Sequence, residues 1–369
     1  MTTTSVTVRD RVVAWLPLVW QGRLSWMRIA LAIVYGMHTY HLVRGWQLDV
    51  PAPAPQGWFL GLVPSGIRDF LLGHPNWVAA GVIVLVVLIV IGLATRPALI
   101  ALVLIGLFAR TIEVSQGIFD HESSLTTQVL FVLAFAPGTN AISLEHLARW
   151  WRGGRKDLLV SLLAPYRQWG VYLILGILAL TYTTSGFSKM RFSGVSWLNG
   201  ETLGFYLRGL TAGTEVYMVG GGPPTWRDDF GIVMYTYGNY NYGNYHPAVL
   251  ADAVDWVAHT PAILIALSVG TVVLELCGFL LFVPRLRSLL LIGYMCMHTT
   301  IGILMGLPFV EYQIVCFFLI EWERIFGFLL RWLDARRTAK VAAGTDSAAP
   351  IPAESSGSGE PPIATAPHG

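Results

Sequence analysis

Long apolar stretches separated by short polar segments fill most of the chain. A bilayer core of about 30 Å requires roughly 20 mostly apolar residues in a helix. The stretches fall near residues 26–43, 78–95, 97–115, 124–140, 169–187, 262–283, 287–306 and 309–330. The fourth is the weakest, because it is short and begins with threonines. The pattern predicts an all-α integral membrane protein with a polytopic bundle of about eight transmembrane helices.

Two pairs of stretches are separated by very short breaks. Thr95-Arg96-Pro97 joins the second stretch to the third, and Pro284-Arg285 joins the sixth to the seventh. Proline interrupts a helix, because it lacks an N–H group and its ring clashes with the preceding turn. Both pairs are therefore predicted to form helical hairpins.

The composition agrees with a membrane protein. Hydrophobic residues make up 54% of the 369 residues and charged residues 12%, whereas soluble domains carry about 25% charged residues. A net charge of +2 is too small to indicate a nucleic-acid surface. The three cysteines, Cys277, Cys296 and Cys316, lie inside apolar stretches, which excludes a disulfide framework or a zinc knuckle and favours a packing role.

Basic residues indicate the orientation. If the N-terminus lies inside, one face collects Arg9, Arg11, Arg23, Arg96, Arg149, Arg152, Arg155, Lys156, Arg167, Arg285, Arg287, Arg331, Arg336, Arg337 and Lys340. The loops on the other face carry mainly Asp and Glu. By the positive-inside rule we expect a multi-pass plasma-membrane protein with both termini in the cytoplasm.

The chain divides by composition into segments. Residues 1–25 form a cytoplasmic N-terminal segment, and the first apolar stretch is expected to be retained, because it is too long and carries too many histidines for a secretory signal. Residues 26–335 form the transmembrane domain, and its long loop 188–261 is expected to make an external cap. Residues 336–369 are rich in Ala, Pro, Ser and Gly and are predicted to be a disordered cytoplasmic tail.

Ionisable residues gather by depth. A polar group inside a span costs several kcal/mol, about 3 or more for a charge at the centre of a helix, so each one raises a functional hypothesis. Near the outer ends of the spans lie His38, His41, Arg110, Glu113, Asp120, His121, Glu122 and Lys189. Glu275 and His298 lie deeper in the sixth and seventh spans. We expect an outward-facing, partly buried polar pocket.

The paired residues of the outer zone have simpler interpretations too. His38 and His41 share a helix face and could ligate a metal or haem, but no third ligand follows at a matching spacing, so a packed or interfacial role is favoured and no metal is expected. Arg110 and Glu113 have the same spacing and are expected to form an ion pair.

Two interpretations remain open for Glu275 and His298, and two for Lys189. Glu275 and His298 could bond across the hairpin as a link between helices, or contact a substrate. Lys189 ends a span and could extend to the interface. If its ammonium instead points into the pocket, burial disfavours the charged form and makes the amine available as a general base.

The cap loop contains an aromatic near-repeat. Tyr and Gly alternate in residues 235–247, which could form a stacking platform for a flat ligand or an ordinary interfacial aromatic belt. Residues 220–224, Gly-Gly-Gly-Pro-Pro, break any helix and could hinge a lid, but lack the setting of a phosphate loop.

Three segments of the chain carry lysine or histidine motifs. One is residues 185–190, Ser-Gly-Phe-Ser-Lys-Met, with Trp197-Leu-Asn-Gly200; the others are residues 119–122 with 130–135 and residues 275–285 with 298–309. In their order along the chain they resemble the membrane domain of vitamin K-dependent gamma-carboxylase, which is a horizontally transferred transmembrane (HTTM) domain. The first resembles the stretch that bears its catalytic lysine, and the other two resemble its histidine-containing segments. The resemblance covers roughly residues 20–335.

The resemblance implies quinol-dependent base chemistry. Lys189 would be the base and His121 its hydrogen-bonding partner, and a vitamin K-like quinol would be the cofactor. The other pocket candidates are Glu275, His298, Trp197, Asp120, Arg110, Glu113, His38 and His41. The chain departs from the carboxylase at Ser188 and Arg191, and it shows no lumenal domain after the spans, so a propeptide-guided carboxylase is not expected.

We therefore expect a bacterial membrane protein, and the resemblance implies a gamma-carboxylase-like lyase or quinol epoxidase. Its expected partners are membrane lipid and a lipid-soluble quinone or a small or peptide substrate. The alternative is a non-enzymatic protein of peptide export, maturation or immunity. A transporter is the third class, but the two halves of the sequence show no clear repeat.

Overall fold

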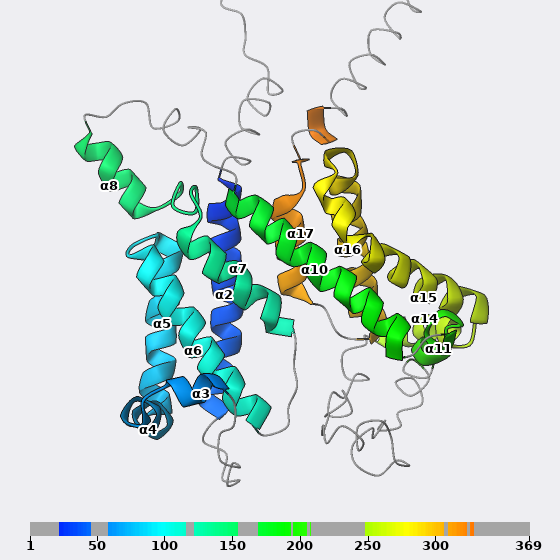
Figure 1. Cartoon of the computed structure of the whole chain (residues 1–369), viewed down its shortest axis with the longest axis horizontal. Helices are drawn as coiled ribbons and strands as arrows, with labels where there is room; N and C mark the ends of the chain where they lie inside the picture. Colours follow the sequence, from blue (N-terminus) through cyan, green and yellow to red (C-terminus); the bar gives the residue numbers. More distant parts are fainter. Residues whose placement is uncertain are drawn as a thin grey trace, which may run out of the picture. The chain divides into compact units, whose positions relative to one another are not determined.

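The computed structural model describes residues 22–45, 58–115, 122–153, 169–192, 195–204, 207, 248–305, 309–322 and 325–327. Every regular element in these ranges is a helix, as predicted (Figure 1). In chain order they are α2 (Arg23–Gly45), α3 (Trp58–Leu62), α4 (Ser65–Gly73), α5 (Pro75–Ile91), α6 (Thr95–Ser115), α7 (Glu122–Phe135), α8 (Leu144–Arg152), α10 (Trp169–Phe192), α11 (Val195–Leu198), α14 (Ala248–Ala258), α15 (Pro261–Leu276), the 3₁₀ helix η2 (Cys277–Phe282), α16 (Pro284–Met305) and α17 (Val310–Leu319).

The chain divides into two compact units at Glu321. The helices from α2 to α17 all belong to the first unit, residues 1–321. In the second unit, residues 322–369, the rings of Trp322 and Phe326 lie 6.0 Å apart. The predicted disordered tail, 336–369, lies outside the described residues, as do residues 208–247 of the predicted cap loop.

Four helical segments are long and apolar enough to cross a membrane. They are residues 95–112, 169–191, 261–282 and 284–305. A fifth span results if α4 and α5, which are bent by 92°, count as one. Three other predicted stretches are helical but differ from a span in length or hydropathy. Polar residues lower the hydropathy of α2, and the described helices α7 and α17 are short.

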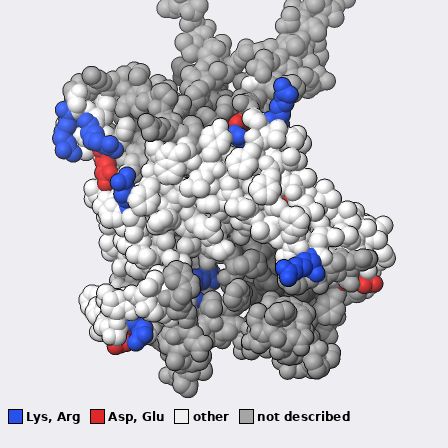
Figure 2. All heavy atoms as spheres, viewed as in Figure 1, with Lys and Arg blue, Asp and Glu red and all other residues white. Residues whose placement is uncertain are grey.

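Many apolar side chains of these helices are exposed, as expected for helices that are surrounded by lipid. Only 22% of an 18-residue apolar window within residues 284–305 and 28% of one within residues 261–282 are buried. On α5, Ile83, Val84 and Val87 are exposed. In the face drawn in Figure 2, charged atoms gather mainly toward two opposite ends, with a largely uncharged band between them. A helix that is hydrophobic all round without being enclosed by protein is typical of a membrane span.

The two predicted hairpins exist, but their turns are displaced. The first turn lies at Gly92–Ala94, where Gly92 ends α5 with φ +73°, and Thr95 already begins α6. The second break lies at Val283, and Pro284 opens α16. Glycine ends a helix at low cost in the left-handed conformation, and proline is tolerated in a first turn, so the predicted breaks are wrong by a few residues.

Helices α10 and α17 connect two groups of helices. In the N-terminal group, α2 packs against α5, α6 and α7, and α17 packs against α2 and α7. In the C-terminal group, α10 packs against α15 and η2, and α16 packs against η2 and α17. Because α10 also packs against α7, it is held between elements that are far apart in the sequence.

Buried Arg28 ties the α7–α8 turn to α2. Its guanidinium donates to the carbonyl oxygens of Thr139 and Ile142, each at 2.9 Å. Ser25 Oγ donates to Thr139 O at 2.9 Å, and the Glu145 N–H donates to Gly92 O at 3.3 Å. The start of α2, the α5–α6 turn and the α7–α8 turn thus meet at one end. All three were assigned to the cytoplasmic side from the sequence.

Candidate functional site

One face of α10 carries the polar groups of the site. Tyr182, Ser185 and Lys189 follow one another at intervals of three and four residues, which places them on the same side of a helix. Ser185 and Lys189 contact α15, and Tyr182 contacts α16. Helix α10 approaches α15 and η2 closely because glycines occupy the contact. A Cβ on Gly186 would lie 3.1–3.2 Å from Leu276 and Glu275 atoms, and one on Gly278 would overlap Thr183 and the Ala179 carbonyl.

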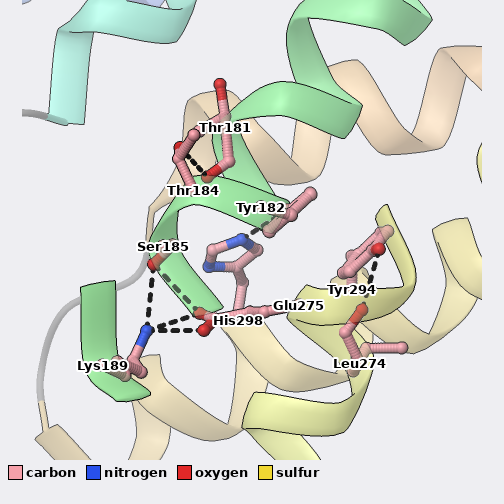
Figure 3. Close-up of polar contacts among 9 residues, drawn as sticks. All are labelled: Thr181, Tyr182, Thr184, Ser185, Lys189, Leu274, Glu275, Tyr294 and His298. Carbon is pink, nitrogen blue, oxygen red and sulfur yellow. Dashed lines mark hydrogen bonds and ion pairs between the residues drawn. The ribbon is translucent and has the colours of Figure 1, made fainter. Parts of the chain in front are cut away.

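The close approach of α10 to α15 brings the Lys189 ammonium into contact with the Glu275 carboxylate. Lys189 Nζ donates to Glu275 Oε1 at 2.6 Å, to Oε2 at 2.8 Å and to Ser185 Oγ at 3.0 Å (Figure 3). Ser185 Oγ in turn donates to Glu275 Oε1 at 3.3 Å. The lysine and glutamate side chains are 20% and 6% exposed. The ammonium therefore has both carboxylate oxygens and a hydroxyl as partners, which offsets part of the cost of desolvating two charges.

Trp197 completes this group. Lys189 Nζ lies 5.3 Å from the centroid of the Trp197 ring, within the range of a cation–π contact. The Trp197 indole Nε1 is buried and has no hydrogen-bond partner within the described part of the chain. The ring limits access of water to the ammonium and leaves one buried N–H donor beside it.

His298 lies in an aromatic cluster next to the ion pair. Its Nε2 and the Tyr182 hydroxyl are 2.7 Å apart, and the Tyr182 ring stacks on Tyr294 with centroids 3.8 Å apart. The rings of Tyr312 and Phe309 lie 5.1 and 5.2 Å from the imidazole. His298 is 5% exposed, and its Nδ1 is buried without a hydrogen-bond partner among the described residues.

The imidazole of His298 lies beside the ion pair. In Figure 3 the imidazole lies between Tyr182 and the Glu275 side chain. Ion pair, hydroxyls and imidazole thus form one polar site on α10, α15 and α16, lined by aromatic rings.

One predicted pairing is replaced by two others. Glu275 and His298 were expected to be able to bond across the hairpin, but Glu275 bonds to Lys189 and Ser185, and His298 bonds to Tyr182. The cause is the close approach of α10, which inserts its polar face next to both residues. Sequence reasoning missed Ser185 and Tyr182, although their spacing from Lys189 along α10 is a signal that could have indicated them.

The structure describes only part of the ionisable group that was predicted near the outer ends of the spans. Arg110 Nη2 lies 2.6 Å from His38 Nε2, which joins α6 to α2. His41 is exposed and its ring lies 5.5 Å from that of Tyr40. The side chain of Glu113 lies outside the described residues, so the expected Arg110–Glu113 pair remains a prediction.

The segment that was expected to support the lysine is not described. Asp120 and His121 lie outside the described residues, and so does the side chain of Glu122. In the described structure Lys189 donates its hydrogen bonds to Glu275 and Ser185. Among the described residues no group of three His, Cys, Asp or Glu side chains is placed to hold a metal ion.

A second buried ion pair offers a comparison. Arg287 Nη1 donates to Glu321 Oε1 at 3.1 Å, and both side chains are 9% exposed. Arg287 Nε also donates to Leu281 O at 3.0 Å. A guanidinium stays protonated in proteins, whereas an ammonium can give up its proton. This arginine pair can therefore only hold η2, α16 and the end of α17 together, while the lysine pair can also exchange a proton.

A scan against protein-family models, a search of curated proteins and a search of solved structures each found no match to the chain. The function must therefore be argued from the site itself.

Proposed function

We propose that the chain is an eight-span protein of a bacterial plasma membrane with both termini in the cytoplasm. Support comes from the four span-length helices, from the bent α4–α5 pair, and from the helices α2, α7 and α17 that occupy the remaining predicted stretches. The orientation rests on the basic residues at the end where Arg28, Arg96 and α8 lie.

We further propose that the site transfers a proton to and from a lipid-soluble quinol. The observation that carries this proposal is the Lys189–Glu275 contact, in which one ammonium and one carboxylate lie 2.6–2.8 Å apart inside apolar helices. A proton can pass from Nζ to a carboxylate oxygen along these bonds, which leaves a neutral amine and a neutral acid. The amine can then accept a proton from a substrate hydroxyl.

The residues around the pair fit a quinol headgroup. The headgroup is flat and apolar with two oxygens at its edge, and the site combines aromatic rings with two buried polar atoms, Trp197 Nε1 and His298 Nδ1, that have no partner in the described part of the chain. When bound, a quinol would supply an ionisable hydroxyl. Lys189 would hold and move the proton, Glu275 would accept it from Nζ, and Ser185 would orient both groups.

The gamma-carboxylase resemblance motivates the reaction class. It implies that Lys189 is a base, that His121 supports it, and that the deprotonated quinol drives carboxylation or epoxidation. The ion pair supports only the first of these steps, because it supplies a proton acceptor in an apolar setting. His121 remains a proposed supporting residue from the resemblance.

The test is to purify the protein in detergent and to ask, by native mass spectrometry and lipid extraction, whether a quinone co-purifies. Lys189→Ala and Glu275→Gln should lose or alter the bound quinone. Glu321→Gln is the matched control, because it removes a buried carboxylate from an ion pair outside the site. If no quinone is bound and added quinol is neither held nor oxidised, the proton-transfer function is wrong and handling of a peptide replaces it.

A further inference from the structure

Helix α8 is short and strongly two-sided. Leu144, Leu147 and Trp151 follow at intervals of three and four residues, which places them on one face. These side chains are 48%, 43% and 59% exposed. Arg149 and Arg152 are exposed on the other side, and no residue of α8 is buried. An exposed apolar face opposite arginines is typical of a helix that lies in a membrane interface.

The start of α8 is fixed to the transmembrane helices. Ser143 caps the helix, because its Oγ accepts from the His146 N–H at 3.0 Å. Arg28 holds the neighbouring Ile142 carbonyl, and Gly92 packs directly on Ser143. Gly92 ends the apolar helix α5, so α8 begins at the level where spans end and the headgroup region starts.

The charge at this end favours an anionic surface. Arg96, Arg149 and Arg152 are exposed, and Figure 2 shows basic atoms gathered over α8. Burial and the nearby Arg149 lower the pKa of His146, so this residue is neutral at neutral pH. The acidic Glu145 is only half-exposed and accepts from Asn140 Nδ2 at 3.3 Å. Arginines can bind a phosphate oxygen through two N–H groups at once.

We propose that α8 lies along the headgroup region of the leaflet at this end of the spans and binds anionic phospholipids. Leu144, Leu147 and Trp151 enter the boundary between headgroups and acyl chains. Arg149 and Arg152 extend to the lipid phosphates above it. The proposed topology makes this the cytoplasmic leaflet, but the lipid binding itself does not depend on the proton-transfer function.

The depth of α8 can be measured with an environment-sensitive fluorophore. Cys277, Cys296 and Cys316 are first replaced by serine or alanine, and a single cysteine is introduced as Leu147→Cys or, on the opposite face, as Glu145→Cys. Each labelled protein is placed in nanodiscs that contain phosphatidylcholine with phosphatidylglycerol. A shallow spin-labelled lipid should quench the Leu147→Cys label at least threefold more than the Glu145→Cys label, while aqueous iodide should show the reverse order.

Lipid selectivity is measured by native mass spectrometry of the same protein released from these nanodiscs. Phosphatidylglycerol should be enriched over phosphatidylcholine on the native chain, and Arg149→Gln with Arg152→Gln should remove at least half of that enrichment. Arg68→Gln is the matched control, because Arg68 lies on α4, outside this end, and faces Asp69 at 3.7 Å.

Three results would overturn the proposal. Equal iodide quenching at both labels would place α8 in water. Protection of the Leu147→Cys label from both iodide and spin-labelled lipid would mean that another protein or a second copy covers the apolar face. Unchanged phosphatidylglycerol enrichment in the arginine variants would remove the role of the charges.

Discussion

Lys189 Nζ lies 2.6 Å from one carboxylate oxygen of Glu275 and 2.8 Å from the other, although 86 residues separate the two in the chain. The contact joins α10 to α15 at the point where Gly186 lets the helices approach. An exposed salt bridge contributes little, but one inside apolar helices requires desolvation of both charges. Its presence is easier to explain by chemistry than by stability.

The pair should therefore be replaceable for stability but not for function. Lys189→Met or Glu275→Leu alone should lower the free energy of unfolding by about 3–5 kcal/mol, because each leaves one charge without its partner. The double variant, Lys189→Met with Glu275→Leu, should unfold at or above the wild-type temperature and still lose quinol conversion. Thermal unfolding in detergent provides the measurement, and a double variant less stable than both single ones would show that the pair is mainly structural.

Lys189→Arg should distinguish a role in proton transfer from a role that needs only the positive charge. The guanidinium can still pair with Glu275, but it cannot give up its proton. We expect quinol conversion to fall by at least 100-fold, about 2.7 kcal/mol of barrier, while a bound quinone is retained. The reverse change at the other pair, Arg287→Lys, should leave conversion within a factor of three. Substantial activity of Lys189→Arg would indicate that the cation only binds.

The spacing of α10 and η2 depends on Gly278. A methyl group there would overlap Thr183 and the Ala179 carbonyl, so Gly278→Ala should cost about 1–3 kcal/mol and displace η2. Gly270→Ala on α15 is the control, because no atom lies within 4 Å of its added methyl group. Its effect should be neutral or stabilising by less than about 1 kcal/mol. Equal melting temperatures for the two variants would contradict the close packing described above.

Arg28 should be among the least replaceable residues outside the site. Its side chain is fully buried and its guanidinium holds the α7–α8 turn through Thr139 O and Ile142 O. Arg28→Ala should destabilise the protein by about 3 kcal/mol, because it leaves buried carbonyl groups without donors. Arg68→Ala, at a half-exposed arginine on α4, should change stability by less than about 0.5 kcal/mol. Chemical unfolding of both variants checks the difference.

Hydropathy predicted the helical architecture because burial in lipid depends on local composition. Each predicted stretch contains a helix, and four helical segments have the length and apolarity of a span. Breaks inside apolar sequence were missed. The bend between α4 and α5, the 3₁₀ segment Cys277–Phe282 and the turn at Gly92 depend on backbone geometry and on neighbouring helices.

The site was predictable by residue type but not by pairing. Lys189, Glu275 and His298 stood out because charged or polar groups are costly inside apolar helices, whereas Trp197 was named through the gamma-carboxylase resemblance. Which of them meet depends on how α10 crosses α15 and α16, and periodicity within one helix carries no information on that crossing. The contact of Lys189 with Glu275 was therefore not foreseen.

Infrared difference spectroscopy tests the proton-transfer function most directly. Spectra of the purified protein are compared before and after addition of a short-chain naphthoquinol. If the proton reaches the pair, the signal of a protonated carboxyl group should appear, should vanish in Glu275→Gln and Lys189→Ala, and should persist in Glu321→Gln. Absence of this signal in the wild-type protein, or its persistence in Glu275→Gln, would contradict proton transfer through Lys189 and Glu275.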